Sequence, residues 1–275
     1  MIYSPKVMQE LLEANGFNFK KNFGQNFIID ENIINSIISN SKIDKDTLVL
    51  EIGPGAGSLT YKLGLNAKEV VCYEIDTKVK NILEHNLEGL DNVKVIYEDF
   101  LKANVKEELK KHDYNKLYVV ANLPYYITTP IIIKLIEDDL NVDKIVVMVQ
   151  KEVGDRFKAK PGSKDYSSLS IFLNYYYDVR KMLDVSKNVF MPKPNVDSIV
   201  VEFTKKEELL TLNNKELFFK LIRDSFKQKR KNLRNNLKDY DLTKISNILA
   251  KYNLDLTVRA ENISIDIFVD IANNL

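Results

Sequence analysis

The chain has 275 residues, of which 45% are hydrophobic and 29% charged, and its formal net charge is +1. This length suits a large domain plus a small one, no apolar stretch approaches the roughly 20 residues of a membrane span, and no secretory signal opens the sequence, so we expect a cytoplasmic protein. A single cysteine and two histidines exclude an internal disulfide and argue against zinc sites and Ser-His-Asp hydrolases, so the chemistry must come from carboxylates, amides, backbone groups and a cofactor.

The first part of the chain predicts alternating helices and strands. Ser4 and Pro5 open a short helix that ends near Gly16, and a second helix carries an isoleucine-rich face over 33–38. Continuous apolar runs then predict strands at 47–52, 69–75, 93–99, 117–123 and 144–150. Strands that alternate with helices form a parallel sheet with right-handed crossovers.

After residue 150 the pattern changes. We predict strands at 168–179, 180–185 and 197–203 with no helix between them, which indicates antiparallel additions at one sheet edge. From about residue 214 the composition favours helices. The sequence therefore predicts a large α/β domain over 1–205 and a small helical domain over 206–275.

A glycine-rich turn, EIGPGAG at 51–57, follows the first of the alternating strands. Such a turn lets the backbone approach a ligand, and the helix after it supplies free N–H donors. The G-x-G-x-G spacing of Gly53, Gly55 and Gly57 differs from the G-x-G-x-x-G of dinucleotide-binding domains and favours S-adenosylmethionine over NAD. A tight strand-to-helix turn with no ligand is the alternative.

Acidic residues end each of the first three of these strands. Glu74, after the second, can accept hydrogen bonds from both ribose hydroxyls of a nucleoside. Asp99, after the third, can accept one from an adenine amino group, and Phe100 beside it can cover the base. Together with Glu51, these residues predict an adenosyl pocket.

The motif Asn122-Leu123-Pro124-Tyr125 ends the fourth strand, where doubly wound folds place their chemistry. The amino group of adenine is a poor nucleophile because its lone pair is delocalised into the ring. The side-chain carbonyl of Asn122 and a backbone carbonyl that accept its two N–H bonds would free that lone pair. Tyr125 can stack on an extruded base, so the motif indicates methylation of an amino nitrogen, and a simple proline turn is the alternative.

Basic residues are concentrated near the C-terminus. Between Lys220 and Arg234 there are seven basic residues and one acid, a local charge of +6, which leaves −5 for the remainder of the chain. This segment is either a phosphate-binding surface or a solvated helix face.

The glycine turn at 51–57 and the Asn-Leu-Pro-Tyr motif at 122–125 together resemble the motifs of the small-subunit (16S) ribosomal RNA adenine dimethyltransferases, the family associated with kasugamycin sensitivity. Further matching stretches lie at 23–30, 122–131, 148–153, 159–166, 190–198, 225–237 and 259–264. The resemblance implies a class I methyltransferase fold, which is α/β and Rossmann-like, with a seven-stranded, mostly parallel sheet and a small C-terminal helical domain. It also implies a role in ribosome biogenesis: dimethylation of N6 of two adjacent adenosines in the hairpin loop near the 3′ end of 16S rRNA, with S-adenosyl-L-methionine as cofactor and S-adenosyl-L-homocysteine as product.

The resemblance also assigns site residues. Asn122 and the carbonyl of Leu123 would hold the target amino group beside Pro124, with Tyr125 and Phe190 on either side of the base. The residues implied to contact the cofactor are Asn26, Ile28, Gly53, Gly55, Glu74, Asp99 and Asn122. Those implied to bind RNA, with the basic loop 151–164, are Arg156, Lys158, Lys227, Lys229, Arg230, Lys231 and Arg234. The chain departs from the family pattern at Ser167, where glycine is usual.

Two alternatives stay open within this fold: a macrolide-resistance methyltransferase acting on 23S rRNA, and an RNA-binding assembly factor without catalysis. The 190–198 stretch and the helical C-terminal part favour the 16S enzymes. We expect a monomer that acts on 16S rRNA in the small subunit or its precursor. We expect neither membrane association nor a bound metal ion. Cys72 is expected in the core, and His85 and His112 on the surface.

Overall fold

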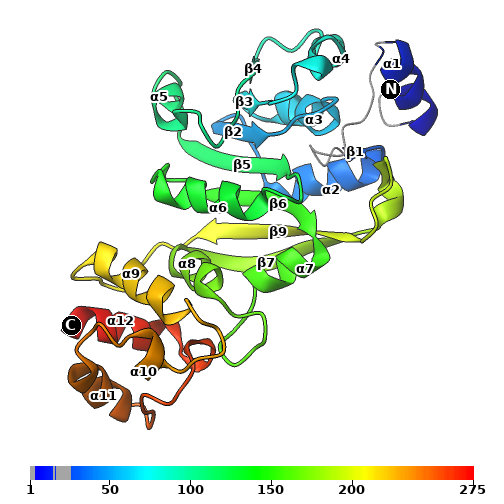
Figure 1. The fold of residues 1–275 in the computed structure, drawn as a ribbon. Helices are drawn as coiled ribbons and strands as arrows, with labels where there is room; N and C mark the ends of the chain where they lie inside the picture. Colours follow the sequence, from blue (N-terminus) through cyan, green and yellow to red (C-terminus); the bar gives the residue numbers. More distant parts are fainter. Residues whose placement is uncertain (1–3, 15, 17–25) are drawn as a thin grey trace. The chain divides into compact units, whose positions relative to one another are not determined.

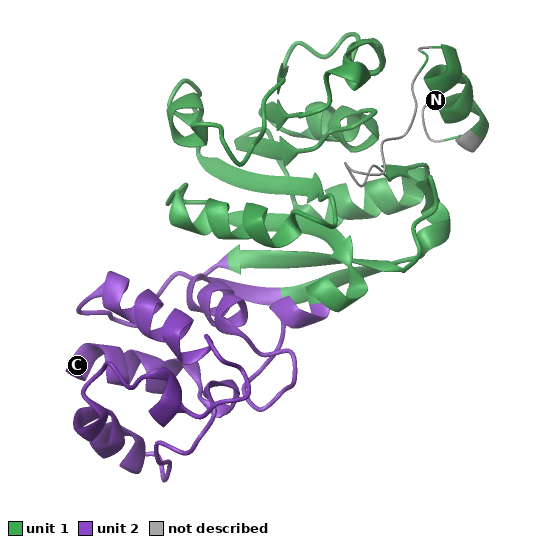
Figure 2. Cartoon of the chain, in the orientation of Figure 1, with its two compact units in different colours: residues 1–154, 180–204 green, residues 155–179, 205–275 purple. Residues whose placement is uncertain are grey.

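The computed structural model describes residues 4–14, 16 and 26–275, so positions 23–25 of one family-like stretch lie outside the described residues. The chain forms two compact units, residues 1–154 with 180–204 and residues 155–179 with 205–275 (Figure 2). The expected division at 205/206 differs, since it left 155–179 with the first part. This segment belongs to the second unit because its side chains Tyr166, Ile171 and Tyr175 are buried in that unit's core.

A seven-stranded sheet with the order β4-β3-β2-β5-β6-β9-β7 forms the centre of the first unit (Figure 1). The parallel strands are β2 (Thr47–Ile52), β3 (Glu69–Tyr73), β4 (Val93–Ile96), β5 (Lys116–Asn122) and β6 (Lys144–Gln150). All residues of β2 are buried, as expected for a strand that is covered on both faces. The predicted α/β fold with a mostly parallel sheet is confirmed.

The last two strands extend the sheet beyond β6. β9 (Ser198–Lys205) runs antiparallel to β6, with Ser198 opposite Gln150, and β7 (Tyr177–Val185) lies outside it. The stretch 186–197 between β7 and β9 contains no α-helix, and antiparallel strands need no crossover helix between them. A separate two-residue pairing joins β1 (Phe27–Ile28) to β8 (Phe190–Met191).

Amphipathic helices cover the sheet of the first unit. α2 begins at Asp30, whose carboxylate accepts hydrogen bonds from the amides of Asn32 and Ile33. Its residues Ile34 and Ile37 pack in one core cluster with α3 and the central strands. The helices of this unit are α1 (Pro5–Ala14), α2 (Glu31–Ser41), α3 (Ser58–Asn66), α4 (Lys80–Asn86), α5 (Val105–Leu109), α6 (Thr128–Glu137) and most of α7 (Lys151–Phe157).

The prediction of a strand at 168–179 is wrong for most of its length. Residues Ser168–Tyr176 form helix α8, and only the residues from Tyr177 onwards join β7. Ser167 begins the helix, with its hydroxyl accepting a hydrogen bond from the amide of Ser170. Ile171 and Tyr175, one helical turn apart, are buried in the second unit's core, so packing of a helical face outweighs the strand preference of the aromatic run.

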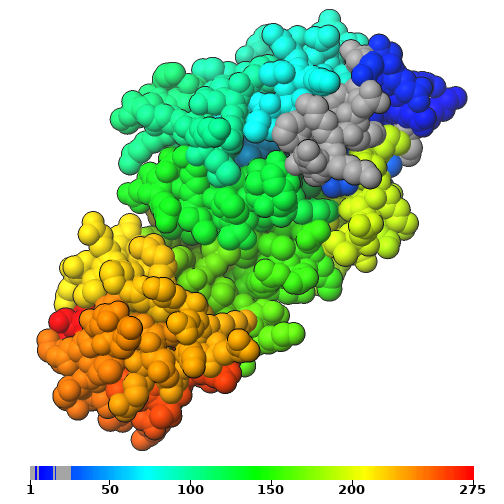
Figure 3. Space-filling model, viewed as in Figure 1, coloured from blue at the N-terminus to red at the C-terminus, as the bar shows by residue number. Residues whose placement is uncertain are grey.

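Helices make up the rest of the second unit, coloured yellow to red in Figure 3. They are α9 (Lys215–Ser225), α10 (Leu233–Asn236), α11 (Leu242–Ala250) and α12 (Ile265–Asn274). Phe218, Leu221 and Phe268 are fully buried between them. The expected helical C-terminal part is confirmed, and in the described ranges no helix is long and apolar enough to cross a bilayer.

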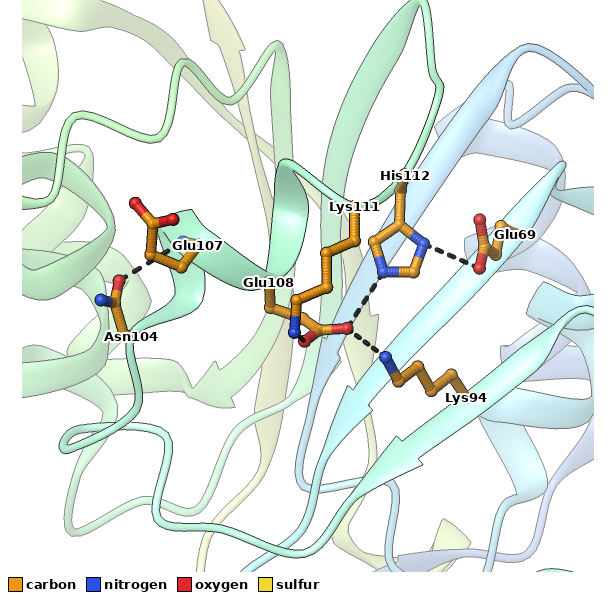
Figure 4. Close-up of polar contacts among 7 residues, drawn as sticks. All are labelled: Glu69, Lys94, Asn104, Glu107, Glu108, Lys111 and His112. Atoms are coloured by element: carbon orange, nitrogen blue, oxygen red, sulfur yellow. Dashed lines mark hydrogen bonds and ion pairs between the residues drawn. The ribbon is translucent and has the colours of Figure 1, made fainter.

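His112 was expected at the surface, and this is wrong. Its side chain is only 7% exposed and lies between two carboxylates, with Nδ1 2.8 Å from Glu69 and Nε2 3.2 Å from Glu108 (Figure 4). Glu108 also pairs with Lys94 on β4 and with Lys111. The histidine is buried because this charge cluster joins the end of α5 to β3 and β4. His85 is exposed and Cys72 is buried, as predicted.

Candidate active site

An open cleft lies at the carboxyl ends of the central parallel strands. A cleft at this edge of a doubly wound sheet is the usual position for a nucleotide-like ligand. Every residue that the sequence assigned to the cofactor lines it: Asn26, Ile28, Gly53, Gly55, Glu74, Asp99 and Asn122. The four residues of the Asn-Leu-Pro-Tyr motif, 122–125, line it as well.

The glycine turn leads from β2 into α3 beneath this cleft. Gly55 has a φ of +57°, in the left-handed region that favours glycine, and a Cβ there would lie 2.7 Å from the ring of Phe27. At Gly53, with a φ of +73°, a Cβ would come no closer than 3.8 Å, to Pro124. The turn therefore presents bare backbone to the cleft, and a side chain at position 55 would both strain the backbone and displace the ring of Phe27.

Two carboxylates from neighbouring strands face the same cleft. Glu74, which follows β3, accepts hydrogen bonds from the amides of Gly55 (3.1 Å) and Asp76 (2.8 Å), and burial raises the pKa of this carboxyl. Asp99, which follows β4, accepts one from the amide of Leu101 at 3.0 Å. Each carboxylate has about four acceptor positions, so both retain capacity for hydroxyl or amino donors of a ligand.

Glu51 contributes a protonated carboxyl to the floor of the cleft. It is 1% exposed, and burial raises its pKa to about 8. The thiol of Cys72, whose own pKa is raised by the same burial, donates to Glu51 Oε2 at 3.6 Å. At neutral pH, Glu51 is therefore predominantly a neutral acid, which can donate as well as accept a hydrogen bond.

A hydrogen bond to the backbone just before β1 fixes the orientation of the Asn122 side chain. Its Nδ2 donates to the backbone carbonyl of Asn26 at 2.9 Å, and this bond orients the amide. Leu123 is fixed through its own amide, which donates to the carbonyl of Met148 on β6 at 3.1 Å. The Asn122 amide and the Leu123 backbone are thus each fixed by a hydrogen bond at the strand end, as is required of preorganised acceptors for an amino group.

The next residues form a turn that is closed by a 3.2 Å bond from the Ile127 amide to the Pro124 carbonyl. Tyr125 is half-buried, and its hydroxyl lies 2.8 Å from Ser198 Oγ on β9. Tyr126 also lines the cleft but is 53% exposed. The two adjacent rings therefore occupy different environments in one site.

Phe190 lies apart from the other site residues that the sequence assigned. It is 3% exposed, pairs with Ile28 across β8 and β1, and packs in the core cluster of the first unit rather than in the wall of the cleft. In this conformation the ring is covered by protein. Stacking of Phe190 on a target base stays a prediction that would require this strand pair to shift.

All seven residues that the sequence assigned to RNA lie in the second unit. The cations at Lys227, Lys229, Arg230, Lys231 and Arg234 are all exposed, in the turn between α9 and α10 and at the start of α10. The 151–164 segment, expected as a loop, is helical over Lys151–Phe157. The ammonium of Lys229 donates to the carbonyl of Lys164 at 2.6 Å, which brings the end of that segment beside the basic turn. Lys158 is half-buried and pairs with Asp155 at 3.0 Å.

Comparison with known proteins decides the family. The family model described as ribosomal RNA adenine dimethylase matches residues 16–275. The chain belongs to this family. It is 54% identical over 242 residues to the ribosomal RNA small subunit methyltransferase A of Staphylococcus aureus (strain bovine RF122 / ET3-1), covering 87% of this chain and 82% of the relative.

Solved structures agree with this assignment to the adenine dimethylase family. A dimethyladenosine transferase from Plasmodium falciparum is 28% identical, with a TM-score of 0.75 over 89% of this chain and 95% of that one. The 23S rRNA methyltransferase ErmE shares the fold, at 24% identity and a TM-score of 0.70, over 91% of this chain and 99% of the other. As a member of the family, the chain is an S-adenosylmethionine-dependent methyltransferase.

The cleft fits that cofactor. It combines bare glycine backbone, carboxylates after neighbouring strands and apolar walls, which suit an amino acid, a ribose and a base in turn. The sequence missed several lining residues, namely Phe27, Ile75, Glu98 and Tyr126. Ile75 and Tyr126 each follow an assigned residue directly, and that adjacency was the available signal. The same signal marked the other two, because Phe27 lies between the assigned Asn26 and Ile28, and Glu98 directly precedes the assigned Asp99.

Proposed function

We propose that the chain transfers methyl groups from S-adenosylmethionine to N6 of two adjacent adenosines in the hairpin loop near the 3′ end of 16S rRNA, two to each. It would act as a cytoplasmic monomer on the small ribosomal subunit or its precursor. The observation that carries the proposal is the cleft itself, because the oriented amide of Asn122 and the carboxylates of Glu74 and Asp99 line the same cleft. The names of the relatives support rRNA of the small subunit as the substrate.

When bound, the cofactor supplies an electrophilic methyl group on a sulfonium. The protein's part is to present the adenine amino group with its lone pair free. Asn122 Oδ1 and the Leu123 carbonyl would accept the two N–H bonds of that group, and Tyr125 would stack on the base. The proton leaves after methyl transfer, so no strong base is required, which agrees with a site built from an amide and a backbone carbonyl.

Cofactor contacts follow from the same geometry. Glu74 and Asp99 would accept hydrogen bonds from the ribose and the adenine, and the Gly53–Gly55 backbone would pack against the amino-acid part. The exposed cations of the second unit would bind RNA phosphates and set the register of the hairpin.

The test offers undermethylated small subunits and labelled S-adenosylmethionine to wild type, Asn122→Ala and Asn40→Ala. Asn40 is an exposed asparagine on α2 and serves as the matched control. We expect Asn122→Ala to lose at least about 100-fold in methyl transfer, because positioning and electrostatic stabilisation fail together. Equal labelling by wild type and Asn122→Ala, or preferential labelling of naked 23S rRNA by wild type, would contradict the proposal.

A further inference from the structure

The second tyrosine of the turn after β5 has an exposure that the fold does not explain. Tyr126 is 53% exposed, the highest value among the large hydrophobic side chains of the described ranges, and it lines the cleft. When a ligand covers a large aromatic ring that is otherwise open to water, the burial of its apolar surface stabilises the bound state. The ring therefore has the properties of a contact surface for something that binds in the cleft.

The surroundings of the two tyrosines indicate which ligand each one contacts. The turn that Ile127 closes onto Pro124 places Tyr125 and Tyr126 at its two central positions. Tyr125 reaches Ser198 on β9, which lies beyond β6 on one side of β5. β3 and β4, which carry Glu74 and Asp99 at their ends, lie on the opposite side of β5.

Tyr126 lines the cleft together with both of these carboxylates, and within the described residues no hydrogen bond joins it to β9. Burial raises the pKa of its hydroxyl, and the charges of Asp99 and Glu74 raise it further, which agrees with a position near them. These are the groups to which the proposed function assigns the adenine and the ribose. The proposed function gives Tyr125 to the target base, and Tyr126 is the neighbouring ring that shares the cleft with the carboxylates assigned to the adenosyl group.

We propose that Tyr126 is a cofactor-positioning residue whose ring covers the adenosyl half of the cleft and slows the dissociation of S-adenosylmethionine and S-adenosylhomocysteine. This inference rests on the proposed function. It assigns the two tyrosines separable roles: loss of Tyr126 weakens cofactor binding without RNA present, whereas loss of Tyr125 affects the RNA reaction.

Titration calorimetry with S-adenosylmethionine and S-adenosylhomocysteine, in the absence of RNA, tests this on the full chain. We expect Tyr126→Ala to raise both dissociation constants roughly 3- to 10-fold, the range for loss of one aromatic contact, and Tyr126→Phe to remain close to wild type. Tyr125→Ala should change them less than about twofold while abolishing RNA methylation. Tyr252→Ala, at a 40% exposed tyrosine in the second unit, controls for loss of a surface ring.

The outcomes separate the two proposals. If wild type binds cofactor and Tyr126→Ala binds it equally well, the role of Tyr126 is refuted and the proposed function stands. If wild type itself fails to bind S-adenosylmethionine, the proposed function fails and this inference falls with it. Because the Tyr126 side chain is half exposed, its replacement leaves the core unchanged, and equal melting temperatures of all variants would confirm that they are folded.

Discussion

At the residue scale, the buried carboxyl of Glu51 makes the stability of the protein depend on pH. Glu51 is enclosed at the floor of the cleft, where burial raises its pKa from an ordinary value of 4.5 to about 8. The folded protein therefore keeps a proton that the unfolded chain releases above pH 4.5. This proton linkage reduces stability as the pH rises from 4.5 to 8, and the reduction is complete once Glu51 ionises in the folded state.

Replacement of Glu51 by glutamine should remove this dependence. We expect Glu51→Gln to unfold with a larger free energy than wild type, by less than about 1 kcal/mol at pH 5 and by on the order of 3 to 4 kcal/mol at pH 8. Urea unfolding at both pH values measures the difference, with Glu88→Gln at an exposed glutamate as the control. A difference that does not grow with pH would show that Glu51 is not protonated in the folded state.

The residues that the sequence could assign were those in motifs. The glycine turn and Asn-Leu-Pro-Tyr are local patterns at strand ends, and a parallel sheet brings the carboxyl ends of its strands to one edge. The sequence could therefore predict that residues of both motifs line one cleft. Glu98 and Phe27 were not assigned although each neighbours an assigned residue, because the sequence does not tell whether adjacent side chains both face the cleft. Phe190 illustrates the reverse limit, since a family pattern cannot tell whether its ring is exposed or covered.

At the element scale, the polar cluster around α5 fastens a short helix to the sheet. α5 has a single buried carboxylate, Glu108, that contacts Lys94 on β4, Lys111 and His112 (Figure 4). Its neighbour Glu107 is 58% exposed and pairs with Lys110. The two glutamates share a helix and differ in burial, which makes them a matched pair.

Loss of the buried member should cost more than loss of the exposed one. We expect Glu108→Ala to lower the free energy of unfolding by about 1 to 3 kcal/mol, because it leaves Lys94 and His112 without their shared acceptor. Glu107→Ala should stay within about 0.5 kcal/mol of wild type, as is usual for an exposed pair. Urea unfolding at pH 7 compares them, and equal losses would mean that the cluster does not stabilise the protein.

The elements that the sequence predicted correctly are those with a clear pattern of apolar residues and with turn residues at their ends. β6 was predicted at the residues it occupies. The antiparallel edge was predicted from strands with no helix between them, and it is present although α7 and α8 lie between β6 and β7. α8 was mispredicted because its run of Ile, Phe, Leu and Tyr satisfies both a buried strand and a buried helix. Only its partners in the second unit, among them Phe218, decide between the two.

At the scale of the whole molecule, charge is divided between the two units. The overall charge of +1 conceals a segment of +6 at 220–234, which belongs to the second unit together with residues 155–164, where Lys229 contacts the carbonyl of Lys164. An overall charge near zero avoids indiscriminate attraction to nucleic acid, and a local surplus can still bind phosphates. We therefore expect RNA affinity, rather than cofactor affinity, to depend on this surface.

A pair of double variants with equal charge change tests this division. Each RNA phosphate that a cation neutralises contributes close to one unit to the slope of log affinity against log salt, so Arg230→Gln with Lys231→Gln should reduce that slope by about 1 to 2. Lys106→Gln with Lys110→Gln, at exposed lysines on or next to α5, should leave it unchanged. Binding to undermethylated small subunits across a salt series gives the slopes, and calorimetry without RNA should show wild-type cofactor affinity for both. Equal slopes for the two variants would mean that rRNA binds through another surface, and weakened cofactor binding in the first would show that the charge of the second unit acts on the methyl-transfer site as well.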